Sequence, residues 1–316
     1  MSKRTNNITI SIVAPVYNEG ENINIFYKSL IQYLIKNKIK YSKIILVIDP
    51  SEDNTFFLAS KLAKQNKKLK IILFSKRFGH QQSLLCGLNH VENSDATIML
   101  DSDLQHPLNL IKNMIETYCK GFDIVNTKRN FSSDVSILNK ITSFIFYKIF
   151  NKLTGLNMET YGADFRLISE KVRMNIVSNF SEQNFFLRGI ISWVGFKQIS
   201  LSYQALERRS GVTKFNLFSR IRFAYNGLLG FSFLPIKFFI YFGFTMSLIS
   251  FLLTIFHVSQ YLNNAALPPG WTTIIVLLTF YFGVSFIFLG LLAKYISLIY
   301  LQVIKRPRYI IDEEIN

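Results

Sequence analysis

Over its first 230 residues the chain alternates short runs of aliphatic residues with longer stretches in which apolar residues recur at helical spacing. Short aliphatic runs are typical of buried strands, and apolar spacings of three and four residues are typical of amphipathic helices. Strands are predicted at Ile8–Ala14, Lys43–Ile48, Leu69–Phe74, Ala96–Leu100 and Asp123–Thr127, and helices at Glu21–Ile35, Asp53–Gln65, Gln81–His90 and Pro107–Cys119. This alternation predicts βαβ units, and therefore an α/β fold with a mostly parallel sheet flanked by helices.

The pattern changes in the last third of the chain. Phe238–Val258 is a run of 21 residues without a formal charge, and Trp271–Ala293 is a second run of 23. At about 1.5 Å per residue, a helix of either length spans the roughly 30 Å hydrocarbon core of a bilayer. Two buried core helices are the alternative, but long core helices normally keep a polar face, and neither run has one. We therefore predict two transmembrane helices.

Composition and charge agree with a membrane protein. Hydrophobic residues make up 49% of the chain, which excludes a disordered protein, and two cysteines are too few for a disulfide-rich secreted scaffold. The formal net charge is +16, yet Asn263–Gly270, between the two apolar runs, has no lysine or arginine. Basic residues instead flank the runs: Lys214, Arg220, Arg222 and Lys237 before them, and Lys305, Arg306 and Arg308 after them. The positive-inside rule then places both termini in the cytoplasm, and a basic collar beside anionic lipid makes a nucleic-acid partner unnecessary.

Polar segments follow each of the first four predicted strands: Pro15–Glu19, Asp49–Asp53, Ser75–His80 and Asp101–His106. The carboxyl ends of parallel strands share one edge of a sheet, and ligands of open α/β sheets bind beyond that edge. The dinucleotide-binding G-x-G-x-x-G and the phosphate-binding G-x-x-x-x-G-K-[ST] are both absent from the sequence. His80 and His106 are expected as polar residues at this edge rather than metal ligands, and Trp193 as part of the core.

Asp101-x-Asp103 is the most informative of these strand ends. Two carboxylates so spaced, with the carbonyl oxygen of Gln105, offer the oxygen ligands that Mg²⁺ or Mn²⁺ prefers. A diphosphate leaving group gains most from such a metal, because negative charge grows on it as its bond breaks. Alone, the pattern also fits a solvated acidic turn; its place among four polar strand ends favours a metal site.

Several strings in order resemble the family 2 glycosyltransferases of the GT-A fold, and more narrowly the polyisoprenyl-phosphate glycosyltransferases, the group of dolichol-phosphate mannose synthase and the bactoprenol glucosyltransferases. The strings are VAPVYNEGENI from Val13, MLDSDLQHP from Met99, YGADFRLIS from Tyr161, FLRGIISWVGF from Phe186, ERRSGVTKF from Glu207, and PGWTTIIV and KRPRYII near the end. The resemblance covers nearly the whole chain.

The resemblance implies a role for particular residues. The nucleotide sugar would be bound by Pro15, Tyr17, Glu19, Asp49, Asp101, Ser102, Asp103, Arg129, Arg208 and Lys214, and the metal by Asp101, Asp103 and Gln105. Asp164 and Arg166 would line the centre where sugar and acceptor meet, and Lys140 and Ser143 would contact the lipid phosphate.

Three segments depart from the family pattern. The usual D-D-G-S is Ile48-Asp49-Pro50-Ser51, so one of two acids is missing and the base preference is open. The usual G-D-F-R-L carries Ala163 between Gly162 and Asp164, and the usual G-x-S-K-Y is Gly211–Phe215, GVTKF.

These expectations define an enzyme that transfers a sugar, with inversion, from a nucleotide sugar of the UDP-glucose type to polyprenyl phosphate. A phosphate acceptor is already an anion at neutral pH, so Asp164 is expected to orient a substrate rather than act as a base. The alternatives are a membrane-tethered nucleotide-binding scaffold, which the intact Asp101-x-Asp103 disfavours, and a polysaccharide synthase, whose Q-x-x-R-W motif is absent.

The expected organisation is a cytoplasmic catalytic domain at 1–210, an interfacial amphipathic region at 211–232, a two-helix transmembrane domain at 233–304 and a cytoplasmic tail at 305–316. The protein is expected in the bacterial plasma membrane as a multi-pass protein. Self-association through the transmembrane helices, and a flippase or a downstream glycosyltransferase as partner, are left open.

Overall fold

The computed structural model describes residues 7–130, 148, 151–155, 162–183, 185–204, 234–262 and 270–316. The chain divides into two compact units, one formed by Met1–Gly227 with Pro307–Asn316 and the other by Leu228–Arg306. The predicted interfacial region 211–232 lies outside the described residues, as do Lys140, Ser143, Arg208 and Lys214.

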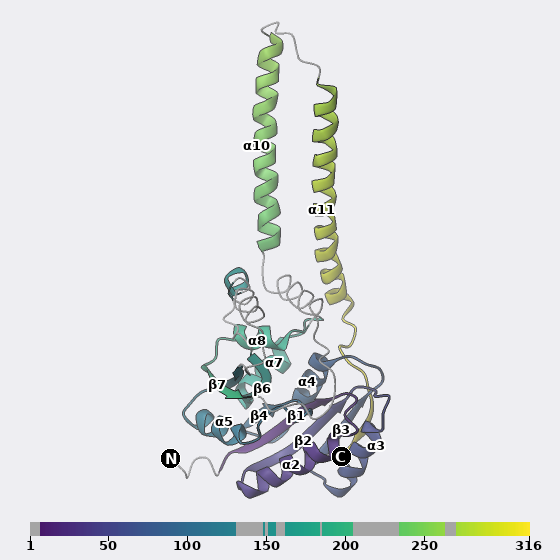
Figure 1. Cartoon of the computed structure of the whole chain (residues 1–316), viewed down its shortest axis with the longest axis vertical. Helices are drawn as coiled ribbons and strands as arrows, with labels where there is room; N and C mark the ends of the chain where they lie inside the picture. Colours follow the sequence, from purple (N-terminus) through teal and green to yellow (C-terminus); the bar gives the residue numbers. More distant parts are fainter. Residues whose placement is uncertain are drawn as a thin grey trace. The chain divides into compact units, whose positions relative to one another are not determined.

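The first unit is built on a mixed sheet, whose described strands run in the order β7-β5-β6-β4-β1-β2-β3-β8 (Figure 1). Strands β4, β1, β2 and β3 are parallel neighbours, β6 and β8 pair antiparallel with β4 and β3, and β5 pairs antiparallel with β6 and parallel with β7. The strands are β1 Thr9–Val16, β2 Lys40–Ile48, β3 Leu69–Phe74, β4 Ala96–Met99, β5 Ile124–Asn130, β6 Gly162–Ser169, β7 Gln198–Gln204 and β8 Ile311–Ile315.

Helices cover both faces of this sheet. Apolar side chains of α2 (Ile23–Lys36), α3 (Thr55–Gln65) and α5 (Leu110–Cys119) join alternate strand residues, such as Ile12 and Leu46, in one core cluster. On the opposite face, α4 (His80–Asn89) packs on β1 and β2 and contacts α7 (Glu170–Asn179). Gly87 permits this close approach, since a Cβ at that position would clash with Val13. The short helix α8 (Leu187–Trp193) follows α7.

The strands and helices predicted for the N-terminal part of the chain are confirmed. Each strand and helix expected between Ile8 and Thr127 is present, with ends displaced by a few residues. The pattern did not predict β6, β7 and β8, and these make the sheet more mixed than expected. The expectation for Trp193 is wrong: this residue is 63% exposed and its ring packs edge-on against Phe180, while Ile190 and Ile191 of the same helix are buried.

Strand β8 returns the chain to the first unit after the apolar helices. It pairs with β3 at the edge of the sheet, where Lys70 contacts Glu314 at 2.8 Å. Just before it, the Tyr309 ring stacks on Phe74 with centroids 5.4 Å apart, and its hydroxyl accepts a hydrogen bond from Asn89 at 2.9 Å. Residues 305–316, expected as a tail, therefore contain a strand of the catalytic sheet.

The second unit contains α10 (Leu234–Leu262) and α11 (Trp271–Ile304). Within the described residues, Tyr281–Ile304 of α11 is long and apolar enough to cross a membrane, with a mean hydropathy of 2.0, and Ile236–Met246 of α10 is a shorter apolar segment. The qualifying stretch extends past Lys294, where the predicted run ended. The first of the two expected spans stays a prediction.

Candidate active site

The strand order brings the predicted polar segments to one edge of the sheet. Because β4, β1, β2 and β3 are parallel neighbours, their carboxyl ends lie side by side. The Ser102 hydroxyl donates to the Pro15 carbonyl at 3.2 Å and so joins the segment after β4 to β1. The backbone N–H of Asn18 donates to the Ser51 hydroxyl at 3.1 Å and joins the segment after β1 to that after β2.

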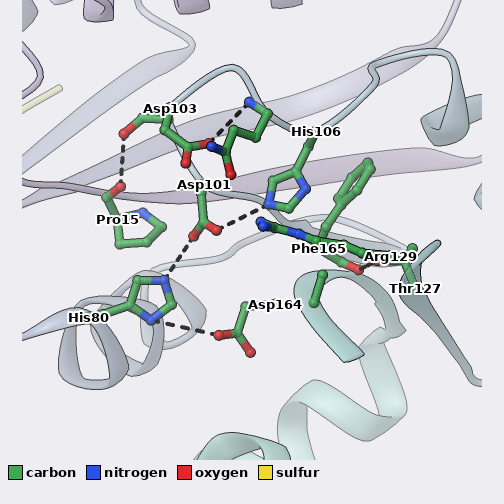
Figure 2. A network of polar contacts seen from close by, with 12 residues as sticks. Pro15, His80, Asp101, Asp103, His106, Thr127, Arg129, Asp164 and Phe165 are labelled. Carbon is green, nitrogen blue, oxygen red and sulfur yellow. Dashed lines mark hydrogen bonds and ion pairs between the residues drawn. The ribbon is translucent and has the colours of Figure 1, made fainter. Parts of the chain in front are cut away.

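Asp101 is held by two histidines that come from different elements. Its Oδ1 lies 2.8 Å from Nε2 of His80, at the start of α4, and its Oδ2 lies 3.1 Å from Nε2 of His106 (Figure 2). Burial alone would raise the pKa of Asp101, but hydrogen bonds from His106 and His80 hold it well below its usual range. Asp101 is therefore a carboxylate, the form that a cation requires.

Asp103 shapes the segment that follows β4. Its Oδ1 accepts a hydrogen bond from the backbone N–H of Gln105 at 3.1 Å. Between them, Leu104 has a φ of 61°, a left-handed conformation that is unusual for a bulky residue. Such backbone conformations persist where the surroundings enforce them, and they cluster at functional sites.

Asp164, on β6, lies at the centre of a buried ion-pair cluster. Both carboxylate oxygens accept from Arg188, Oδ1 from Nε and Oδ2 from Nη2, each at 2.8 Å. Oδ1 also accepts from Arg166 Nη2 at 3.0 Å, and His80 Nδ1 lies 4.0 Å from Oδ2. Although burial would raise the pKa of Asp164, the charge and hydrogen bonds of Arg188 lower it far below its usual range. His80 thus stands between the two carboxylates, Asp101 and Asp164 (Figure 2).

Arg166 points into the interior of the site. Its side chain is buried, and burial lowers the pKa of its guanidinium to about 10 against the raising effect of Asp164. One Nη2 hydrogen bond goes to the Ala163 carbonyl at 2.9 Å, and Nε has no hydrogen-bond partner within the described residues. The residue inserted relative to the family pattern thus accepts from the arginine of that segment.

Arg129, on β5, reaches the site through β7. Arg129 and Tyr203 are register partners of the parallel β5–β7 pair, and Arg129 Nε donates to the Tyr203 hydroxyl at 3.1 Å. That hydroxyl lies 2.9 Å from Nδ1 of His106. A continuous path of hydrogen bonds therefore joins Arg129 to Asp101.

The residues expected to bind the nucleoside surround the segment after β3. The Asp49 carboxylate accepts from the backbone N–H groups of Phe78 at 2.9 Å and Gly79 at 3.0 Å. The Arg77 guanidinium stacks on the Tyr17 ring at 3.9 Å from its centroid. Glu19 accepts from Asn22 Nδ2 at 2.7 Å. The hydrogen bonds of Asp49 therefore position the loop that precedes His80. This role does not depend on whether Asp49 also contacts a nucleotide base.

The sequence did not single out Arg188 or Tyr203, and it placed His80 and His106 at this edge of the sheet as polar residues without a role. Arg188 lies in the string FLRGIISWVGF, and the two histidines follow predicted strand ends, so weak signals existed. Of the predicted residues, Asp101, Asp103, Gln105, Asp164, Arg166 and Arg129 lie in or beside the contact network, while Lys140, Ser143, Arg208 and Lys214 lie outside the described residues.

The donor atoms after β4 fit a hard divalent cation. Within the part of the chain that the structure describes, no three His, Cys, Asp or Glu side chains form a metal site by themselves. Two carboxylates, Asp101 and Asp103, with the remaining positions filled by diphosphate oxygens and water, are the ligand type that Mg²⁺ and Mn²⁺ accept.

The carboxyl ends of the parallel strands thus carry paired acidic and basic side chains, and sequence comparison gives the family of the chain. Residues 11–176 match the model for glycosyl transferase family 2. The bactoprenol glucosyl transferase of Shigella phage SfII is 35% identical over 96% of this chain and 97% of its own length. The prophage bactoprenol glucosyl transferase homolog of Escherichia coli is 34% identical over 96% and 98%, and the uncharacterized glycosyltransferase sll0501 of Synechocystis is 31% identical over 97% and 95%. The chain belongs to glycosyl transferase family 2 and is a glycosyltransferase with a GT-A fold.

Among solved structures, mannosyl-3-phosphoglycerate synthase from Rubrobacter xylanophilus matches with a TM-score of 0.45 and 15% identity, over 71% of this chain and 72% of that chain. So distant a likeness adds nothing to the family assignment, which rests on the sequence matches.

Proposed function

We propose that this protein transfers a hexose from a nucleoside diphosphate sugar, of the UDP-glucose type, to polyprenyl phosphate in the membrane, with inversion at the anomeric carbon. The observation that carries the proposal is the extent of the match to bactoprenol glucosyl transferases. It covers 96% of the chain and so includes the apolar helices as well as the catalytic unit.

The charges of the site suit a reaction between two anions. An acceptor phosphate approaching a diphosphate sugar is repelled by it and by exposed carboxylates. Asp164 adds little to this repulsion, because Arg188 and Arg166 neutralise it. Arg129, whose Nε donates to Tyr203, is the donor we assign to phosphate oxygens.

In the proposed step, an acceptor phosphate oxygen forms a bond to the anomeric carbon while the bond from that carbon to the nucleoside diphosphate breaks. The leaving diphosphate takes the electron pair. Mg²⁺ or Mn²⁺ held by Asp101, Asp103 and Gln105 would neutralise the charge that grows on it. No proton has to leave the acceptor, so Asp164, paired with two arginines, orients groups rather than acting as a base.

We further propose that Pro15, Tyr17, Glu19 and Asp49 face the nucleoside, that Ser102 and the residues Arg208 and Lys214 complete the nucleotide-sugar site, and that Lys140 and Ser143 contact the lipid phosphate. We place both termini in the cytoplasm, with catalytic, interfacial, transmembrane and C-terminal segments at 1–210, 211–232, 233–304 and 305–316. Self-association through the apolar helices, and a flippase or downstream glycosyltransferase as partner, belong to the same proposal.

The experiment is transfer of radiolabelled sugar into a butanol-extractable lipid by the purified full-length protein. UDP-glucose, UDP-galactose, UDP-N-acetylglucosamine and GDP-mannose are compared with Mg²⁺ or Mn²⁺ and undecaprenyl phosphate, with undecaprenol as the control acceptor. We expect label in the lipid only with the phosphorylated acceptor and most from UDP-glucose. Label that appears equally with undecaprenol, or in a polymer, would contradict the proposed acceptor.

A further inference from the structure

The hydrogen bonds between Arg129 and Asp101 have a defined direction. A guanidinium can only donate, so Arg129 Nε–H donates to the Tyr203 oxygen at 3.1 Å. The single hydroxyl hydrogen of Tyr203 is then available to His106 Nδ1, which lies 2.9 Å away. With Nδ1 as the acceptor, the ring hydrogen that faces Asp101 lies on Nε2 and is donated to Asp101 Oδ2 at 3.1 Å. We assign this tautomer to His106.

Packing keeps the His106 ring in place. Its side chain is 1% exposed, against 28% for Asp101 and 40% for His80. The ring centroid lies 4.8 Å from that of Phe165 and 5.9 Å from that of Tyr203, so two aromatic rings restrict its rotation (Figure 2 shows the first of them). The buried His106 therefore holds Asp101 by Oδ2, and Oδ1 contacts the more exposed His80.

We propose that His106 and Tyr203 are positioning residues that orient the Asp101 carboxylate toward the divalent cation, and that Tyr203 joins this carboxylate to Arg129. This inference rests on the proposed function, because it assumes that Asp101 is a metal ligand. Hydrogen-bond partners of metal ligands orient those ligands, and their loss typically weakens metal binding about 10–100-fold.

The test measures binding of Mn²⁺ to the purified full-length protein in detergent with UDP present, by the electron paramagnetic resonance signal of free Mn²⁺. His106→Leu removes the donor, and we expect the Mn²⁺ dissociation constant to rise about 10–100-fold. His106→Gln keeps an N–H at a similar place and should recover most of the affinity. Tyr203→Phe keeps the ring and removes one hydroxyl, and we expect a rise of about 2–12-fold, the range for one neutral hydrogen bond.

Tyr118→Phe is the matched control. It also removes one hydroxyl, which bonds the Asp95 carbonyl at 3.2 Å away from the site, and should leave Mn²⁺ binding unchanged. If wild-type protein does not bind Mn²⁺ with UDP, the proposed metal site is wrong. If wild type binds and Tyr203→Phe and a folded His106→Leu bind equally tightly, the positioning role is wrong and the metal site stands. Should His106→Leu fail to fold, Tyr203→Phe alone decides, since it keeps the aromatic packing.

Discussion

Replacement of Arg188 by methionine tests the charge balance of the buried cluster around Asp164. The change removes two charge-assisted hydrogen bonds, both at 2.8 Å, and leaves the single bond from Arg166 at 3.0 Å. The Asp164 side chain is 8% exposed, so water cannot replace what is lost. The variant must therefore either hold a poorly compensated carboxylate or protonate it.

Breaking a buried ion pair by removing one partner typically costs about 3–5 kcal/mol. Because Arg166 still pairs with Asp164, we take the lower end, about 3 kcal/mol at pH 7. For a domain of this size that corresponds to a fall of about 6–12 °C in the unfolding midpoint.

The pH dependence separates charge from packing. In the wild type the pKa of Asp164 is lowered, so the pair's contribution to stability is present above the usual aspartate range and is lost as pH falls through the folded-state pKa. In Arg188→Met burial dominates and raises that pKa, so protonation in mild acid relieves the variant. The stability difference between the two proteins should therefore be largest at pH 7 and shrink toward pH 4.5.

Thermal unfolding in detergent, followed by intrinsic fluorescence from pH 4.5 to 8, measures this difference. Arg173→Met is the control: Arg173 is also buried and pairs with Glu170 at 2.7 Å, but the Glu170 side chain is 37% exposed and can hydrate. We expect the difference in unfolding temperature between wild type and Arg173→Met to change little with pH. If Arg188→Met unfolds at a temperature lower than wild type by the same amount at every pH in this range, the electrostatic reasoning is refuted.

Three further predictions follow from other parts of the molecule. Asp103→Asn should lower sugar transfer at least about 100-fold at saturating Mg²⁺ or Mn²⁺, and full activity would exclude Asp103 from the metal site. Gly87→Ala should lower the catalytic unit's stability by about 1–2 kcal/mol, since the clash with Val13 outweighs the better helix propensity, whereas Gly290→Ala, in open space, should not; thermal unfolding compares them. Tyr309→Ala should speed amide hydrogen exchange in β8 and β3 but not in β4, because it removes the stack on Phe74; equal effects in all three strands would contradict a local role.

The elements that could be predicted from the sequence are those with a distinctive local pattern of hydrophobic residues. Aliphatic runs such as Ile44–Ile48 are buried on both faces of a parallel sheet, so their composition identifies them directly. Strand β8, with sequence IDEEI, lies at an edge, and its three acidic residues make it look like a solvated tail. Trp193 was misplaced because an apolar run was taken as uniformly buried, whereas Trp193 is the last residue of α8 and is exposed while Ile190 and Ile191 are buried.

The same limit applies to the site. Asp101 and Asp103 could be found because a strand end fixes where its next residues lie. The link from Arg129 through Tyr203 to His106 depends on the register of β5 against β7, which joins residues 74 apart in the chain. Likewise Arg188 meets Asp164 only because α8 and β6 are adjacent in the folded unit. Such partners follow from tertiary structure, and no local spacing encodes them.

The position of β8 after α11 has a consequence for biosynthesis. At translation rates of about 5–20 residues per second, β8 leaves the ribosome on the order of 10–50 s after its partner β3. The apolar helices α10 and α11 are made in the last part of that interval. Until β8 is made, β3 is an edge strand without its antiparallel partner, a state open to wrong pairing. The catalytic sheet is therefore completed only once the hydrophobic segments have been synthesised.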